Sequence, residues 1–220
     1  MSEFSSGIMI RICHKDIALK YMEDNTYLIQ LNDFWLCRLS ENDFSNHLSE
    51  RNYSEAVLNL SEHIPLMHIV NAEDHGFGLG ILHHKNLVFN FGVDYGVEAE
   101  FAFQIGQELY GDEYMFKLHD AEVIKHIQRE TKNRFAEVEE KIKSFFSEID
   151  AEQIGHFSLF SFQQEVCDRI QHILTYQNHQ IDKIGHQMIQ ELYAAIRLEE
   201  FCFVSHSYVS ENREVFKIVQ

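Results

Sequence analysis

The chain has 220 residues, of which 45% are hydrophobic and 18 are phenylalanine. This composition argues against disorder and provides enough apolar surface for a packed core. The formal net charge of −17 disfavours direct binding to nucleic acid or to anionic membranes, because both carry the same sign of charge.

The first half of the chain has the frequent glycines and alternating apolar residues that are typical of strands and turns. Seven of its glycines fall between residues 76 and 111, and its apolar residues often alternate with polar ones. Strands are predicted over residues 7–13, 26–31, 34–39, 66–70, 77–84 and 87–93, and short helices over 14–23 and 42–63. The second of these helices has a possible break near Asn52 and ends before Pro65, the one proline of the chain.

The second half has the period of long helices. Residues 97–109 fit both a helix and a strand, with a helix favoured. Apolar residues at steps of three and four predict one helix over 120–149. A second such pattern over 162–195 predicts either one helix or two that meet near Asn178.

Apolar and polar residues alternate again near the end of the chain, so strands are predicted over residues 200–209 and 214–219. The overall prediction is an α+β fold with an antiparallel sheet and a long helical hairpin. It is treated as one domain, in which residues 1–118 form a sheet-rich part, 119–198 a helical arm and 199–220 strands that return to the sheet. The long apolar stripes predict that some of the arm is buried against a second copy or another protein.

Four widely separated cysteines lack the spacing of a zinc site or of a dense disulfide framework, which favours a reducing compartment. The first residues have neither the basic nor the apolar region of a signal peptide, and apolar runs are too short to span a membrane. The predicted location is therefore the cytoplasm. No cofactor-binding motif is present, so no cofactor is predicted.

The strongest charge signal lies between residues 52 and 116, where ten acidic residues stand against Lys85 alone. Such a segment projects a negative field that favours cationic partners. The predicted partner is another protein with a basic surface. The residues expected to bind it are Glu73, Asp74, Asp94, Glu98, Glu100, Glu108, Asp112 and Glu113.

A second hypothesis places a metal ion near the glycine-rich hairpin, where histidines and carboxylates occur together. Its ligands would be His75, His83 and Glu98, since zinc and related metals need three or four converging groups. This site would make the protein a metal-dependent hydrolase. No spacing typical of a metalloenzyme accompanies these residues, so a solvated hairpin edge is favoured instead.

His119-Asp120 resembles the dyad of the HD-type metal-dependent phosphohydrolases. The resemblance covers two residues only, and it implies an all-helical fold with a further upstream histidine and a downstream aspartate on helices. In this chain the upstream histidines fall on a predicted hairpin. The sequence instead predicts that Asp120 begins a helix, where a carboxylate is favoured by the helix dipole.

No motif in the chain fixes a reaction. The charge distribution therefore favours a non-catalytic binding protein, such as an inhibitor, an immunity-type factor or an adaptor, that engages a basic surface. The alternatives are the metal-dependent hydrolase and a structural oligomer formed through the long helices.

Overall fold

The computed structural model describes residues 4–41, 52–72, 75–147, 149–175, 186–199, 201 and 204–219. A six-stranded antiparallel sheet forms its centre, in the order β2-β3-β1-β4-β5-β6. The strands are β1 (Phe4–Arg11), β2 (Tyr27–Gln30), β3 (Trp35–Leu39), β4 (Leu66–Ala72), β5 (Gly76–His83) and β6 (Asn86–Asp94). The predicted α+β class is confirmed.

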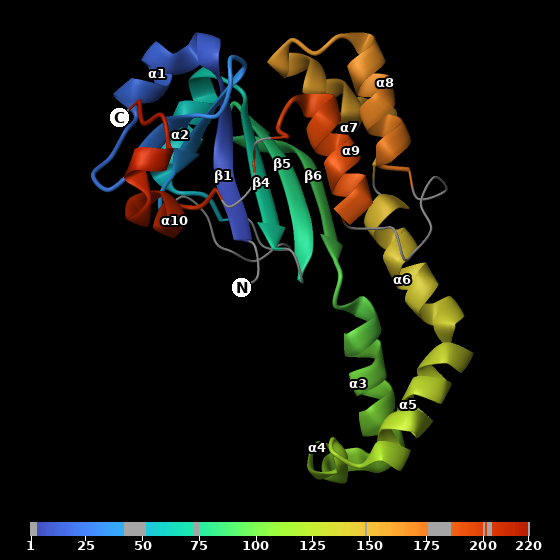
Figure 1. Ribbon diagram of the computed structural model, residues 1–220. Helices are drawn as coiled ribbons and strands as arrows, with labels where there is room; N and C mark the ends of the chain where they lie inside the picture. The colour runs from blue at the N-terminus through green and yellow to red at the C-terminus, as the bar shows by residue number, and fades with distance from the viewer. Residues whose placement is uncertain are drawn as a thin grey trace.

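Both faces of the sheet are covered by helices (Figure 1). One face packs against α1 (Lys15–Lys20), which follows the short turn η1 (Ile12–His14), and against α2 (Glu55–His63). The other face packs against α7 (Ala151–Gly155), η3 (His156–Phe160), α8 (Gln164–Ile173) and α9 (His186–Ile196). Because both faces are covered, all five residues of β3 are buried and apolar residues do not alternate with polar ones along it.

A further group of helices forms an arm that projects from the sheet (Figure 1). The arm leaves the end of β6 as α3 (Val97–Tyr110) and turns through η2 (Gly111–Glu113) and α4 (Tyr114–Lys117). It returns as α5 (Ala121–Asn133) and α6 (Phe135–Ser147), and α6 leads back to the sheet. A small core of Ile105, Tyr114, Val123 and Ile127 holds its far half together.

The helix predicted over residues 120–149 is broken into α5 and α6. Arg134 lies between them with φ −100° and ψ 20°, and neither proline nor glycine accounts for the break. Its guanidinium bonds Glu108 on α3 and Glu137 on α6, so the bend keeps both helices in contact with α3. Periodicity alone could not indicate this bend, because the apolar spacing continues through it.

The pattern over residues 162–195 forms two helices, α8 and α9, which pack against each other and against the sheet. This outcome confirms the two-helix alternative. The proposed meeting point at Asn178 lies outside the described residues. The part that projects therefore begins at residue 97, earlier than the predicted arm, whereas α8 and α9 belong to the body of the molecule.

The last segment of the chain contains helices where strands were predicted. Residues 206–211 form α10 (His206–Glu211), and η6 (Arg213–Val215) follows it. Ser205 begins α10 because its hydroxyl accepts a bond from the backbone N–H of Tyr208 at 3.3 Å. The segment nevertheless returns to the sheet, since Val219 N–H donates to Leu28 O at 2.7 Å.

Candidate functional site

The carboxylates predicted to bind a partner lie in different settings. Glu73 and Asp74 fall outside the described residues. Asp94 accepts a hydrogen bond at 2.7 Å from the backbone N–H two residues later, so it supports the turn from β6 into α3. Glu98 and Asp112 are exposed and belong to no ion pair within the described segments.

The other three carboxylates of this set are matched by cations. Lys141 pairs with Glu100 at 2.6 Å, and Arg134 pairs with Glu108 at 2.7 Å, in both cases from the opposite helix of the arm. Glu113 bonds the lysine four residues later at 2.7 Å, and this bond lowers the pKa of its carboxyl. The negative field of the segment is therefore partly neutralised, and a partner needs further contacts to bind there.

The three residues proposed as metal ligands do not converge. His75 immediately precedes β5 and His83 is its last residue, so at ~3.3 Å per residue they lie about 25 Å apart. Glu98, in the first turn of α3, lies near the His75 end. Among the residues that the structure describes, no group of three or more histidines, cysteines and carboxylates is placed to hold a metal ion.

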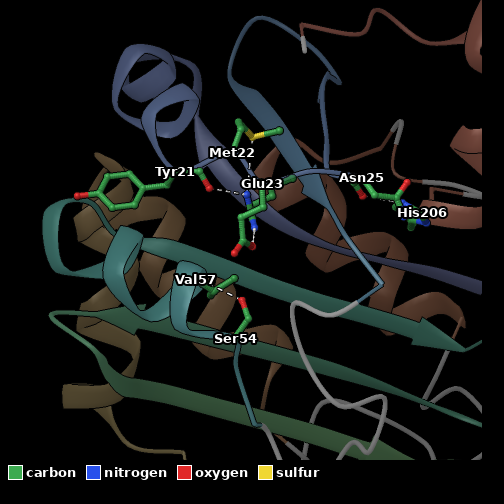
Figure 2. A network of polar contacts seen from close by, with 8 residues as sticks. Tyr21, Met22, Glu23, Asn25, Ser54, Val57 and His206 are labelled. Atoms are coloured by element: carbon green, nitrogen blue, oxygen red, sulfur yellow. Dashed lines mark hydrogen bonds and ion pairs between the residues drawn. The ribbon is translucent and has the colours of Figure 1, made fainter.

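Among the described residues, the guanidinium of Arg38 on β3 is a deeply buried charge, since its side chain is 1% exposed. It donates to the carbonyl oxygen of Tyr21 at 2.9 Å and to Glu23 at 3.1 Å, and it approaches the sulfur of Met22 (Figure 2). These partners all come from the loop that follows α1. The guanidinium thus fixes this loop over the sheet, and its hydrogen-bond partners are residues of the same chain.

The turn between β5 and β6 is fixed to the carboxyl end of α2. His84 and Lys85 both have positive φ, 50° and 64°, which is costly without glycine or asparagine. Their backbone N–H groups bond the carbonyl and the hydroxyl of Ser61 at 2.8 and 3.1 Å. Lys85 also pairs with Glu62 at 2.9 Å. These contacts hold the turn in the left-handed region.

Two histidine rings lie against each other at this turn, since the ring centroids of His83 and His84 are 3.9 Å apart and their planes are tilted by 37°. Burial lowers the pKa of His83, and the nearby His84 and His156 lower it further. These effects favour the neutral imidazole of His83. These histidines therefore have a structural role at the turn. Within the described segments they belong to no group of three or more residues that could hold a metal ion.

The far end of the arm concentrates exposed apolar side chains. Of the ten large hydrophobic residues that are exposed in the described part of the chain, seven lie on the arm. Five of these belong to residues 109–124, here called the apolar tip: Leu109, Met115, Phe116, Leu118 and Ile124. Phe116 is 89% exposed, the highest value among them. Such a concentration is typical of a protein-binding surface.

The apolar tip stands on a small, well-packed base. Gly106 on α3 lets the ring of Tyr114 lie directly on the helix, since an added Cβ would be 2.4 Å from the ring. Asp120 begins α5 and accepts a bond from Glu122 N–H at 2.9 Å, which confirms its predicted helix-starting role. Nearby, the hydroxyl of Tyr110 bonds the ring nitrogen of His126 at 2.7 Å.

Sequence reasoning did not identify the apolar tip. Its signal was the run Tyr114-Met115-Phe116-Lys117-Leu118, which lies beyond a glycine and is too short to form a buried helix of its own. Only Tyr114 of this run is buried. The apolar pattern that predicts a helix over residues 120–149 includes Ile124, whereas in α5 Val123 is buried and Ile124 is exposed.

No helix in the described part of the chain combines the length and the apolar character needed to cross a membrane. No protein-family model, no curated protein and no solved structure matches the chain.

Proposed function

We propose that the protein is a non-catalytic binding factor that engages another protein through the apolar tip of its arm. The observation that carries this proposal is the concentration of exposed apolar side chains at the end of a projecting helical element. Phe116 and Met115, 89% and 54% exposed, would serve as anchors in a pocket of the partner. Large side chains of this kind contribute most of the energy at many interfaces.

The partner would combine an apolar hollow with a basic rim. Residues 108–124 contain five carboxylates and one lysine, so the surroundings of the tip are negative. Asp112 is exposed and outside any ion pair of the described segments, and Glu113 and Glu122 have only local lysine partners. Exposed local pairs can exchange their partner at low cost. Opposite charge on the partner would speed association and make it sensitive to salt.

The construction of the arm favours recognition by a preformed surface. The pairs Lys141–Glu100 and Arg134–Glu108 join its two sides, and the guanidinium of Arg134 lies 4.9 Å from the ring centroid of Phe101. A preformed element loses less conformational entropy on binding than a flexible one.

We also place this function in a reducing compartment such as the cytoplasm. Cys13 is exposed and Cys37 and Cys167 are buried, and all three are free thiols. An exposed free thiol is better tolerated where disulfides are not formed.

The proposal is tested by replacing Phe116 with serine and comparing it with a matched substitution elsewhere. Val215 in η6 is 68% exposed and lies outside the arm, so Val215→Ser is the control. Both variants and the wild type are immobilised and exposed to lysate of the organism that makes the protein. We expect a protein that is retained by the wild type and by Val215→Ser and is lost with Phe116→Ser.

The partner identified in this way is then titrated against each purified variant. Loss of a buried aromatic anchor, about 2 kcal/mol, corresponds to an affinity about 30-fold weaker for Phe116→Ser. We also expect weaker binding at high salt. If no retained protein distinguishes Phe116→Ser from Val215→Ser, the proposal is rejected. If the retained protein is a second copy of this chain, light scattering will show a dimer that Phe116→Ser dissociates, and the structural-oligomer alternative replaces it.

A further inference from the structure

Two arginines meet at one aromatic ring at the end of the sheet remote from the arm. The guanidinium carbon of Arg11 lies 3.5 Å from the ring centroid of Phe34, and that of Arg197 lies 5.1 Å from the same centroid. Arg11 is the last residue of β1, Phe34 precedes β3, and Arg197 follows α9. Three elements distant in sequence thus bring two cations to one aromatic ring.

The backbone around these side chains is firmly held. The side-chain oxygen of Asn32 accepts bonds from Phe34 N–H at 2.8 Å and Trp35 N–H at 2.9 Å, and its amide nitrogen donates to Arg197 O at 2.9 Å. The indole N–H of Trp35 donates to Ile196 O at 2.7 Å. The backbone at Phe34 and Arg197 is therefore held by hydrogen bonds within the fold.

The ring between the arginines is fixed as well. Phe34 stacks on Phe162 with centroids 5.4 Å apart and an interplanar angle of 17°. Arg11 donates from Nη1 to the carbonyl oxygen of Phe160, which orients its guanidinium. Its Nε is buried and has no hydrogen-bond partner in the described part of the chain. One donor of a fixed guanidinium is thus left unused.

The positive charge around Phe34 is unusual in so acidic a molecule. The chain carries 35 acidic residues and 18 lysines and arginines, yet neither Arg11 nor Arg197 pairs with a carboxylate among the described residues. Asp33, next to Phe34 in sequence, is exposed and pairs with neither arginine. Burial lowers the pKa of Arg11 and, with Arg11 nearby, also that of His14. Two neighbouring cations without an anion repel each other.

Arg197 also has a backbone conformation that an arginine rarely adopts. Its φ is +60°, and it occupies the position after α9 where the N–H of Leu198 bonds the carbonyl of Tyr193 at 2.8 Å. Glycine is the usual residue at this helix end. A cation near a helix carboxyl end is favourable, but that effect does not require the left-handed position. Residues in such strained conformations are frequent at binding sites.

We propose that Arg11 and Arg197 form a binding site for an oxyanion, the phosphate or carboxylate group of a small molecule. Guanidinium groups donate two parallel hydrogen bonds to either group, and two of them at one ring provide both charge and direction. The anion would neutralise the pair and accept hydrogen bonds from both guanidinium groups. This site is independent of the apolar tip, which lies at the far end of the arm.

The test is calorimetric titration of the whole protein with inorganic phosphate and, separately, with acetate. Sodium chloride at matched ionic strength is the reference, because salt alone affects so acidic a protein. Arg197→Gln removes one guanidinium from an exposed position, and Arg129→Gln removes one from the exposed surface of the arm as a control. We expect wild type and Arg129→Gln to bind equally, and Arg197→Gln at least ~10-fold more weakly.

A further variant separates the effect of charge from that of hydrogen-bond geometry, and the two anions distinguish phosphate from carboxylate. Arg197→Lys keeps the charge and loses the fork, so its affinity should fall between those of the wild type and Arg197→Gln. Binding of phosphate alone, or of acetate alone, identifies which group the site takes. If neither anion binds the wild type more tightly than chloride, or if Arg197→Gln binds as the wild type does, the site does not exist.

Discussion

At the scale of single residues, the arm depends on a glycine that brings a ring against a helix. An added Cβ at Gly106 would lie 2.4–2.6 Å from three ring atoms of Tyr114, which is 7% exposed. Tyr114 belongs to the small core that supports the apolar tip. The ring cannot move without opening that core, so the contact ties the position of α4 to α3.

We therefore predict that Gly106→Ala destabilises the end of the arm by about 1–3 kcal/mol, the usual cost of an overpacked core. Amide hydrogen exchange should become faster in α4 and α5. Gly155→Ala is the control, because a Cβ there meets nothing within 4 Å and the residue has a helical φ of −54°. This control should be neutral or stabilising by up to ~1 kcal/mol. Equal protection of α4 in both variants would contradict the packing account.

The adjacent histidines at the turn between β5 and β6 predict a pH dependence of stability. The pKa of His83 is lowered in the folded protein, first by burial and then by His84 and His156. In the unfolded chain the group keeps the ordinary histidine pKa of about 6.5. The unfolded state therefore binds more protons as the pH falls below that value, and stability is lost in the acid direction.

His83→Asn should reduce this acid destabilisation. Urea unfolding at about pH 7.5 and about pH 5.5 measures it, and we expect a smaller difference between the two pH values for His83→Asn than for the wild type. His119→Asn, on the exposed surface before α5, is the matched control. If the unfolding free energy changes equally between the two pH values in the wild type and in His83→Asn, the fold does not disfavour protonation of His83.

At the scale of elements, the hydrophobic period predicted most strands and helices but not the break at Arg134, through which the apolar spacing continues. The strands of the sheet and the helix over residues 97–109 were predicted within a few residues. The alternation of residues between the two faces of a strand gave the wrong face where a bulge shifted the register. A bulge opposite Ile81 and Leu82 pairs Leu87 with Leu82, so Leu87 leaves the face shared by Phe89 and Phe91 and is 40% exposed.

The same reasoning explains what was predictable of the two candidate sites. Composition indicated the acidity of residues 52–116, but not that Lys141 and Arg134 would return to neutralise part of it. The pair Arg11 and Arg197 is separated by almost the whole chain, and no local pattern relates them. Their meeting at Phe34 depends on tertiary packing, which spacing in a single sequence does not encode.

The C-terminal segment acts as a short seventh strand that covers the exposed edge of β2. Gln30 N–H donates to Lys217 O at 2.9 Å, Val219 N–H donates to Leu28 O at 2.7 Å, and Ile218 forms an isolated bridge with Ile29. Uncovered strand edges promote pairing with other chains. A few extended residues thus protect this side of the sheet.

Val219→Pro removes the N–H that bonds Leu28, and we predict a loss of about 1–3 kcal/mol in the free energy of unfolding. Urea unfolding measures the loss, and light scattering should detect increased self-association as the β2 edge becomes available. Val219→Ala keeps the N–H and loses only part of a half-buried side chain, so it should cost about 1 kcal/mol or less. If the two variants are equally stable and equally monomeric, the edge is not protected by this bond.

At the scale of the whole molecule, salt should act in opposite directions on the two parts of the structure. The net charge of −17 destabilises the compact state by repulsion, and added salt screens this repulsion. The arm is joined by exposed ion pairs such as Arg134–Glu108 and Lys141–Glu100, which salt weakens. Its own core is small, so these pairs matter more there than in the doubly covered sheet.

We therefore predict that sodium chloride raises the thermal midpoint of global unfolding while it speeds amide exchange in α3 and α5. Both are measured on the same samples, by calorimetry and by hydrogen exchange read out by mass spectrometry. The arm opens locally, below the free energy of global unfolding, so the two readouts report different events. Arg134→Gln should remove most of the salt effect on exchange in the arm and leave the rise of the midpoint in place. If salt protects the arm and the sheet alike, repulsion dominates throughout, and the arm is not held by its ion pairs.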